Sequence, residues 1–326
     1  MSESRLQSLI LQLEQDGFSE TALHLYREQS RRNPILREFH RLLGHDAESV
    51  RELKQIRFLP ISFFKSHRVI SENKNPVIEF SSSTTTGSVP SIHPVADLGL
   101  YEEVFLDIFS RRYGQPEDLS IMALLPSYLE RKGSSLVYMV DKLIRKSHSP
   151  FSGFFLNNHQ ELASSIRKAK EAGNKIILFT VTFALLELAR EEFNLEDVLV
   201  IETGGMKGRG KELTREELVE YVSRLCRPAG IDSEYGMTEL LSQAYSSENG
   251  LLQSPSWMRI LVRASDDPFH MTDYGRGLLN IIDLANLDSC SFIASDDLVL
   301  STEEGFRIMG RADHSEIRGC NLLVAG

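Results

Sequence analysis

Cysteine is scarce in this chain, and long apolar runs are absent. Cys226, Cys290 and Cys320 are the three cysteines among 326 residues, and they lie far apart without the paired spacing of a zinc site or a disulfide framework. No apolar run approaches the roughly 18 to 20 residues of a membrane helix. The first residues lead into an amphipathic helical pattern instead of a signal peptide's apolar core. We therefore expect reduced thiols, no membrane span and a cytoplasmic location.

An excess of positive charge is also missing. The formal net charge is -10 at pH 7, and no basic stripe or tail stands out, so the sequence excludes nucleic acid as a partner. Hydrophobic residues make up 41% and charged residues 25%, which is ordinary for a globular protein with a full core. The length fits one large α/β domain with appended helices.

The hydrophobic pattern divides the chain into two parts. Residues 4–55 place apolar side chains three or four apart, which predicts a helical N-terminal region over 1–58. Beyond it, strand-like and helical runs alternate, which favours βαβ units and a largely parallel sheet. We expect strands at 77–80, 121–125, 153–156, 176–179 and 198–201, with helices near 95–112, 134–147, 159–172 and 183–193.

Two further signals complete the predicted core over 59–326. Thr214 and Glu217 have the spacing of a capping box, which predicts a helix through Leu225. After Trp257 the segments are short and rich in turn residues, which predicts an antiparallel, β-rich C-terminal part.

A hydroxyl-rich loop follows the strand expected at 77–80. Residues 81–88 contain seven serines and threonines around Gly87. Hydroxyl and backbone N–H groups in such a loop can surround phosphate oxygens, and glycine allows close approach. A solvated linker is the alternative reading of this segment alone.

A second segment, 233–239, combines groups that an ATP site uses. Tyr235 offers a ring for a purine, Gly236 flexibility, Thr238 a hydroxyl for phosphate and Glu239 a carboxylate for Mg²⁺. On its own, the segment could equally begin a helix. Further along, the acidic 296–297 pair offers carboxylates for ribose hydroxyls, and the Gly-Arg-Ala-Asp run at 310–313 offers an arginine and a turn, although acidic runs are commonly solvated faces.

Other chemistries match less well. Residues 205–211 read G-x-x-x-x-G-K, as in a P-loop, but Glu212 stands where a Mg²⁺-binding hydroxyl belongs. Ser62 and Lys65 have the S-x-x-K spacing of serine acylases without the partner motifs. His67 and His93 are isolated and have no metal-ligand spacing.

The order of the segments resembles the adenylate-forming superfamily. Its phosphate loop, Y-G-x-T-E, T-G-D-L and G-R-x-D motifs correspond to 82–90, 235–239, 295–298 and 310–313. More closely, 59–65, 202–207 and 310–320 resemble the LuxE-type acyl-protein synthetases, which are related to the phenylacetate-CoA ligases. The resemblance implies the large-domain α/β fold of that superfamily, with an N-terminal helical region, a β-rich C-terminal part and no C-terminal lid domain.

The resemblance also assigns roles to individual residues. Residues implied at the ATP phosphates are Ser83, Thr84, Thr85, Thr86 and Gly87. Residues implied at the rest of the nucleotide are Gly204 and Gly205 at the adenine, Tyr235 and Gly236 at the base, Thr238 at the α-phosphate, and Asp297 and Arg311 at the ribose. Glu239 is implied as the Mg²⁺ ligand and Cys320 as the thiol that accepts the acyl group.

Departures from the family pattern keep other readings open. Thr84 replaces a glycine, 89–90 read Val-Pro in place of Pro-Lys, and Asp296 replaces the glycine before Asp297. The sequence ends seven residues after Gly319, from which we expect no lid.

The function implied is ATP-dependent activation of a carboxylic acid, suggested to be fatty, and transfer of the acyl group to a thiol. That thiol would lie on the chain itself or on a partner in a reductase or acyltransferase complex. An acyl- or aryl-CoA ligase and a catalytically silent nucleotide-binding scaffold are the alternatives.

Overall fold

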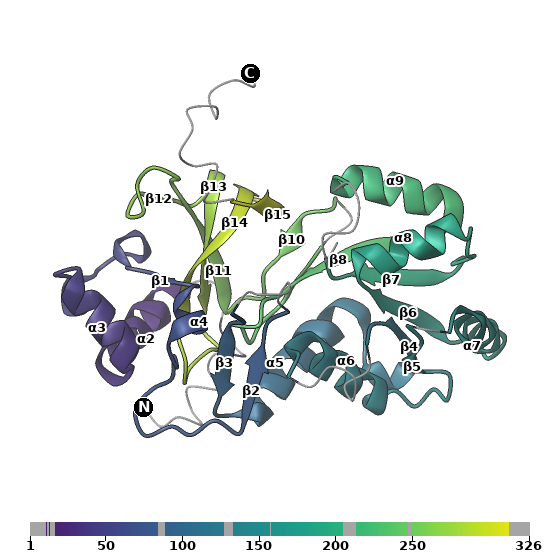
Figure 1. The fold of residues 1–326 in the computed structure, drawn as a ribbon, viewed down its shortest axis with the longest axis horizontal. Coiled ribbons are helices and arrows are strands. Elements are labelled where there is room, and N and C mark those ends of the chain that lie inside the picture. The colour runs from purple at the N-terminus through teal and green to yellow at the C-terminus, as the bar shows by residue number, and fades with distance from the viewer. Residues whose placement is uncertain are drawn as a thin grey trace, which may run out of the picture. The chain divides into compact units, whose positions relative to one another are not determined.

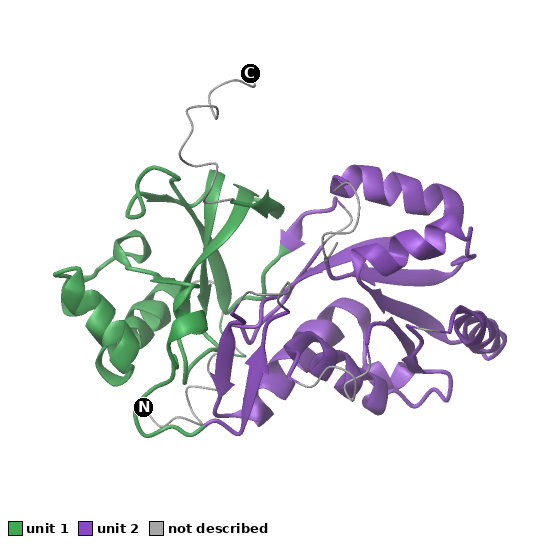
Figure 2. Cartoon of the chain, in the orientation of Figure 1, with its two compact units in different colours: residues 1–75, 253–326 green, residues 76–252 purple. Residues whose placement is uncertain are grey.

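The computed structural model describes residues 11, 13, 17–83, 89–126, 133–156, 158–204, 213–246 and 249–312. The chain forms two compact units: unit 1 comprises 1–75 and 253–326, and unit 2 comprises 76–252 (Figure 2). Unit 2 is therefore one continuous segment, and unit 1 is assembled from two. The predicted division into 1–58 and 59–326 stays a prediction.

Unit 2 contains the predicted parallel sheet (Figure 1). Its strands run in the order β9-β8-β7-β6-β4-β5, in which β8 and β9 are antiparallel and all other neighbours are parallel. Their bounds are β4 Leu119–Leu124, β5 Gly153–Phe154, β6 Lys175–Thr180, β7 Val198–Glu202, β8 Gly230–Tyr235 and β9 Ala244–Ser246. The βαβ prediction is thus confirmed, although β8 was not predicted.

Most helices of unit 2 begin where the sequence supplies a side-chain cap. They are α5 Leu98–Tyr113, α6 Ser135–Lys146, α7 His159–Glu171, α8 Thr182–Arg190 and α9 Arg215–Cys226, with the short η4 Pro116–Asp118 before β4. Asp97, Ser134 and Asn158 accept hydrogen bonds from the first turns of α5, α6 and α7. The capping box of Thr214 and Glu217 at α9 is present as predicted.

Both faces of this sheet are covered. Successive strand residues point to opposite sides, so Met122, Leu178 and Val200 join one core with α7, α8 and α9. On the other side, Phe179 of β6 stacks on Phe109 of α5 at a ring-centroid distance of 6.1 Å. Burial on both faces explains why these strands read as continuous apolar runs.

A β-hairpin precedes the sheet in unit 2. Strands β2 Ile78–Ser81 and β3 Ile92–Val95 are antiparallel, with Ser81 opposite Ile92. Residues 81–88 were expected to lead from a strand toward a helix, and β3 was not predicted. The residues next to the two strands pair instead, because Ser82 N–H donates to Ser91 O at 3.0 Å.

Unit 1 combines helices from the N-terminal segment with antiparallel strands from the C-terminal segment. The helices are α2 Phe18–Arg32, α3 Pro34–Leu42, η2 Ala47–Ser49, η3 Leu53–Gln55 and α4 Phe63–Ser66. The C-terminal strands are β11 Met258–Arg263, β12 Met271–Thr272, β13 Gly275–Asp283, β14 Phe292–Thr302 and β15 Gly305–Arg311, and β10 Leu252–Gln253 lies at the boundary. The N-terminal segment adds the short strand β1 Leu59–Pro60, which is parallel to β14. The helical N-terminal region and the β-rich C-terminal part are both confirmed.

Buried polar side chains join the two segments of unit 1. Gln29 Nε2 donates to Asn286 O at 2.9 Å and to Leu287 O at 3.0 Å, and Gln29 Oε1 accepts from Ser291 N–H at 2.9 Å. Leu59 of β1 pairs with Ile293 of β14 in parallel register. Because buried polar groups need partners, these bonds fix how the segments pack.

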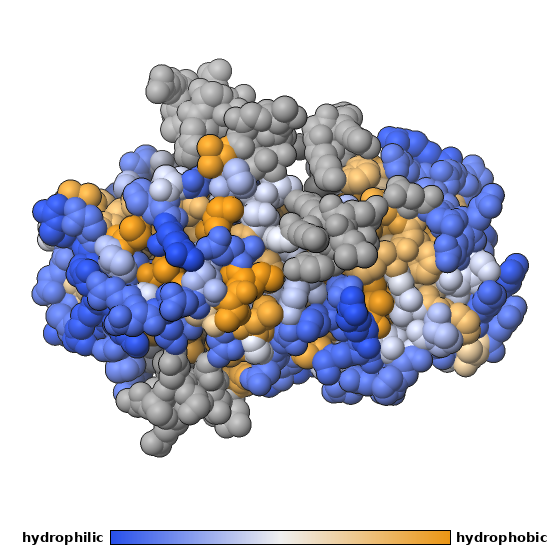
Figure 3. Space-filling model, turned by 60° about the horizontal axis from the view of Figure 1, so that its bottom comes forward, coloured by the Kyte–Doolittle hydropathy of each residue, from blue (hydrophilic) through white to orange (hydrophobic). Residues whose placement is uncertain are grey.

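The surface agrees with the composition. Figure 3 shows hydrophilic side chains over much of the visible face, with apolar groups between them. In the described ranges, every helix is too short or too polar to cross a bilayer.

Candidate functional site

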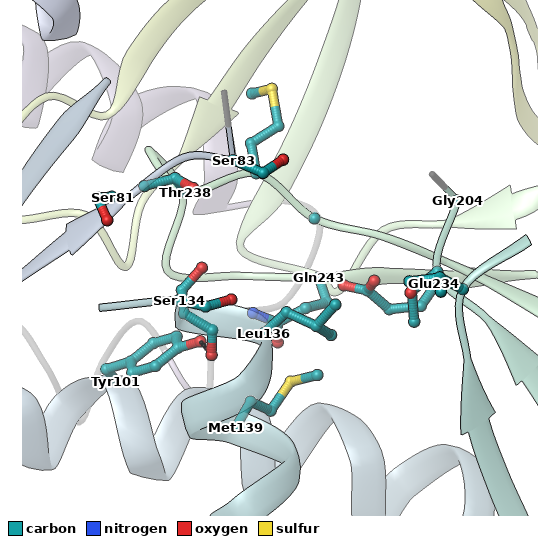
Figure 4. A pocket seen from close by; sticks show the side chains of 15 residues that line it. Ser81, Ser83, Tyr101, Ser134, Leu136, Met139, Gly204, Glu234, Thr238 and Gln243 are labelled. Carbon is teal, nitrogen blue, oxygen red and sulfur yellow. Dashed lines mark hydrogen bonds between the residues drawn. The ribbon is translucent and has the colours of Figure 1, made fainter. Parts of the chain in front are cut away.

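A cavity of about 210 Å³ lies within unit 2, where the parallel strands end (Figure 4). In open α/β sheets, ligands bind outside the carboxyl ends of the strands. Segments from six parts of unit 2 contribute to it: the β2 end, α5, the beginning of α6, the turn after β6, the turn after β7, and the end of β8 with the residues that follow. Its lining residues are Ser81, Ser83, Tyr101, Ser134, Ser135, Leu136, Met139, Val181, Thr203, Gly204, Glu234, Gly236, Met237, Thr238 and Gln243.

The cavity brings together motifs that lie about 150 residues apart in the chain. Ser83 follows β2, Gly204 follows β7, and Gly236 and Thr238 follow β8, and all four line the same cavity. His93 of β3 bonds through Nδ1 to the backbone oxygen of Thr238 at 2.8 Å, which connects the hairpin to the 235–239 segment. His93 is therefore a buried structural group. The ligand roles of these residues stay predictions.

The turn after β7 is held by a buried carboxylate. Glu202 Oε1 accepts one hydrogen bond from Gly204 N–H at 2.8 Å and another from the Thr182 hydroxyl. Gly204 has φ +75°, a left-handed conformation that favours glycine. Burial raises the pKa of Glu202. These contacts fix the corner of the chain that borders the cavity, where the sequence predicts adenine binding.

Glu234, next to Tyr235, faces the cavity from β8 (Figure 4). Burial, with a further contribution from the charge of Glu202, raises its pKa to about 8. A β-carbon at Gly236 would lie 2.5 Å from Glu234 Oε1, so a larger residue there would require the Glu234 side chain to shift.

Glu239 and Tyr235 are sequence neighbours of residues that line the cavity. Glu239 is buried, and Tyr235 is half-buried at the end of β8, opposite Ala244 of β9. Among the described residues, no group of three or more His, Cys, Asp or Glu side chains is placed to hold a metal ion. Mg²⁺ commonly takes one or two carboxylates together with substrate phosphates, so a single buried Glu239 fits the predicted role.

The remaining predicted ribose ligands belong to unit 1. Asp297 of β14 and Arg311 of β15 are register partners, and Arg311 Nε donates to Asp297 Oδ1 at 3.1 Å. Asp297 is buried while Arg311 is largely exposed. The structure thus brings the two together as an ion pair.

Several predicted residues fall outside the described ranges. They are Thr84, Thr85, Thr86, Gly87, Gly205 and Cys320, together with the whole P-loop-like run at 205–211.

Some cavity residues were not predicted from the sequence. Glu234 and Gln243 belong to the segment around the Y-G-x-T-E motif, but neither was given a role. Ser134 had a local signal, because a serine before an apolar helical run suggests a cap. Burial of Gln243 beside a cavity has no such signal in the sequence.

Sequence comparison alone gives no assignment: no protein-family model and no curated protein matches this chain. Solved structures do match. A 2-hydroxyisobutyryl-CoA ligase, in an open conformation with 2-HIB-AMP and CoA, aligns over 90% of this chain and 74% of its own with TM-score 0.66 and 12% identity. The same ligase in its postadenylation state with 2-HIB-AMP aligns with a TM-score of 0.65 and 13% identity. That alignment covers 96% of this chain and 69% of the ligase.

A third match is ATP-bound MatB from Rhodopseudomonas palustris, with TM-score 0.52, 15% identity, and coverage of 72% of this chain and 47% of that protein. The fold is that of the adenylate-forming ligases. The predicted large-domain fold is therefore confirmed.

Proposed function

We propose that this chain activates a carboxylic acid as its acyl-adenylate with ATP and passes the acyl group to a protein thiol, in the manner of an acyl-protein synthetase. The observation that supports it most is the meeting of Ser83, Gly204 and Thr238 in one cavity at the strand ends of an adenylate-forming fold. Each comes from a different segment that the resemblance assigns to ATP.

In the proposed reaction, a carboxylate oxygen attacks the α-phosphorus of ATP, and the bond to pyrophosphate breaks. Ser83 and Thr238 would donate to phosphate oxygens, and the 202–204 turn would orient the adenine. Catalysis would rest on positioning and on stabilising the charge that develops on the phosphate. Glu239 would hold Mg²⁺, which when bound neutralises phosphate charge.

In the second step, a thiolate attacks the carbonyl carbon of the mixed anhydride, and AMP leaves. We propose Cys320 as that thiol, on the resemblance of 310–320 to the acyl-protein synthetases; it lies outside the described residues. The acid would be fatty, the site of action cytoplasmic, and the partner a reductase or acyltransferase complex. Coenzyme A as the acceptor is the competing hypothesis, since the matched 2-hydroxyisobutyryl-CoA ligase binds it.

The deciding experiment is exchange of labelled pyrophosphate into ATP across a panel of aliphatic and aromatic acids. We expect exchange only when Mg²⁺ and a suitable acid are both present. If no acid supports exchange and calorimetry detects no ATP binding, the enzyme proposal is wrong.

Two substitutions separate this proposal from a P-loop enzyme. Glu239→Gln should lower exchange by about 10² to 10³-fold, because it removes charge from the proposed Mg²⁺ ligand. Lys211→Ala should leave exchange within about a few-fold of wild type, because no proposed contact to ATP is lost. The reverse pattern would favour the P-loop.

The acceptor is tested separately. Cys320→Ser should keep acid-dependent exchange but lose hydroxylamine-labile labelling by radioactive acid, whereas Cys226→Ser and Cys290→Ser keep both. If Cys320→Ser is still labelled, Cys320 is not the acceptor, and the acyl group is passed to CoA, another cysteine or a carrier protein.

A further inference from the structure

Gln243 has an unpaired hydrogen-bond acceptor at the cavity. Its side chain is only 5% exposed, and its Nε2 donates to Leu241 O at 3.2 Å. Its Oε1 is buried and has no hydrogen-bond partner in the part of the chain that the structure describes. A buried acceptor without a partner is unfavourable, so a cavity that retains one is suited to a ligand that donates to it.

Glu234 lines the same cavity and lies near the Gln243 side chain. A β-carbon on Gly236 would contact both side chains, at 2.5 Å from Glu234 Oε1 and 3.5 Å from Gln243 Cγ. With its pKa near 8, the Glu234 carboxyl is largely protonated at neutral pH. It then offers an O–H donor, while Gln243 Oε1 offers an acceptor. A hydroxyl group satisfies both, because it accepts one hydrogen bond and donates another.

The walls around this pair suit the hydrocarbon part of a ligand. Leu136 and Met139 line the cavity from α6, and Tyr101 lines it from α5 (Figure 4). Phosphates and sugar would need polar partners along these walls, whereas an acyl chain would pack against them. The hydroxyl therefore fits an acid better than it fits the nucleotide.

We propose that the acid activated by this chain carries a hydroxyl group, and that Gln243 and Glu234 select for it by hydrogen bonding. This inference rests on the proposed function and narrows its substrate to hydroxylated acids. A site built to bond a hydroxyl discriminates strongly against the analogue that lacks it, because its own polar groups are then left unpaired.

The test compares matched pairs of acids that differ only by one hydroxyl, at several chain positions, in the exchange assay. For wild type we expect the best hydroxylated acid to exceed its unsubstituted partner in kcat/KM by on the order of 10²-fold. Gln243→Met keeps the volume but removes the acceptor, and should reduce this preference to within about a few-fold. Gln253→Met, at an exposed position, is the matched control and should keep the preference.

A second variant covers the case in which Gln243→Met does not fold. Glu234→Leu removes the other partner of the hydroxyl and should also lose the preference. Equal use of both members of every pair by wild type would overturn the proposal, as would an intact preference in either folded variant.

A parallel measurement of KM for ATP shows whether the ligand group that donates to Gln243 belongs to the acid or to the nucleotide. If Gln243→Met raises KM for ATP equally with every acid and leaves the acid preference unchanged, the donor belongs to the nucleotide and the proposal is wrong. Calorimetric binding of the same acid pairs, without turnover, separates the two proposals. Preferential binding of a hydroxylated acid, lost in Gln243→Met, supports the hydroxyl site even if exchange fails; no binding of any acid overturns it.

Discussion

Glu234 shows how one residue's surroundings can set its protonation. Burial and the neighbouring charge of Glu202 raise its pKa from an ordinary value of 4.5 to about 8. Tyr101 and Tyr245 also interact electrostatically with it, and burial raises the pKa of both. Between pH 4.5 and 8 the folded state therefore binds more protons here than the unfolded state.

This difference predicts a pH-dependent stability. Because the folded state binds the extra proton, the contribution of Glu234 to stability falls as pH rises through that window. Glu234→Gln stays neutral, so its Tm relative to wild type should rise from pH 5 to pH 8. Scanning fluorimetry across this range measures the difference. Glu220→Gln, on an exposed position of α9, should show no such trend; a flat difference for Glu234→Gln would contradict the assignment.

The two described cysteines are predicted to be inert. Burial raises the pKa of Cys226 to about 11 and that of Cys290 to about 12, and Cys290 Sγ donates to Phe292 O at 3.4 Å. At pH 7.5 the thiolate fraction of each is below about one in a thousand. Iodoacetamide should therefore label neither in the folded protein and both after unfolding in urea, as peptide mass mapping would detect. Labelling of either in the native state would show that its surroundings open readily.

At the scale of elements, Asn33 connects a helix start to a distant turn in unit 1. Its Oδ1 caps α3 by accepting from Ile35 N–H at 3.0 Å, and its Nδ2 donates to Ser289 O at 3.0 Å. The side chain is fully buried. One residue thus serves both a local and a long-range contact.

Removing both contacts should be costly. Asn33→Ala loses the cap and leaves the Ser289 carbonyl unpaired, for which we expect a loss of about 2 to 4 kcal/mol. Asn33→Ser keeps a capping oxygen but loses the Nδ2 donor to Ser289 O, so its loss of stability should be roughly half that of Asn33→Ala. Urea unfolding monitored by circular dichroism gives both values. Equal losses in the two variants would show that the cap contributes little.

Elements with a strong pattern were predictable, and those without one were not. The apolar runs of β4, β6 and β7 and the capped helices between them matched expectation, because burial on both faces requires continuous apolar residues. Strand β8 has Ile231 as its one aliphatic residue, and β3 contains Pro94, which argues against a strand. Both segments are strands because they pair with neighbouring strands, β3 with β2 and β8 with β7.

The same distinction applies to the site. Thr238 was predicted from a local motif, and Gly204 from the resemblance of 202–207; both line the cavity, and their roles stay predictions. Gln243 and Glu234 gain their significance from burial and from each other, which only the folded chain creates. The sequence motifs therefore include residues that line the cavity, but they gave no role to Glu234 or Gln243.

At the scale of the whole molecule, unit 2 should be able to fold alone. It is one continuous segment, and the core formed with α7, α8 and α9 lies wholly inside it. We expect residues 76–252, expressed separately, to unfold cooperatively on heating, with the circular dichroism of an α/β protein. Residues 1–75, which lack their partner strands, are the control and should show no cooperative transition. Failure of 76–252 to unfold cooperatively would show that its stability depends on unit 1.

The pairing of Leu59 with Ile293 has a consequence for biosynthesis. As the nascent chain leaves the ribosome, residues 1–75 emerge first but cannot complete their core until β14 has been translated. Buried groups such as Tyr26, Phe58 and Leu59 stay exposed throughout that delay, while 76–252 has all its own strands available. Exposed apolar surface on a waiting segment promotes aggregation. The N-terminal helices are therefore where this protein should depend most on chaperones.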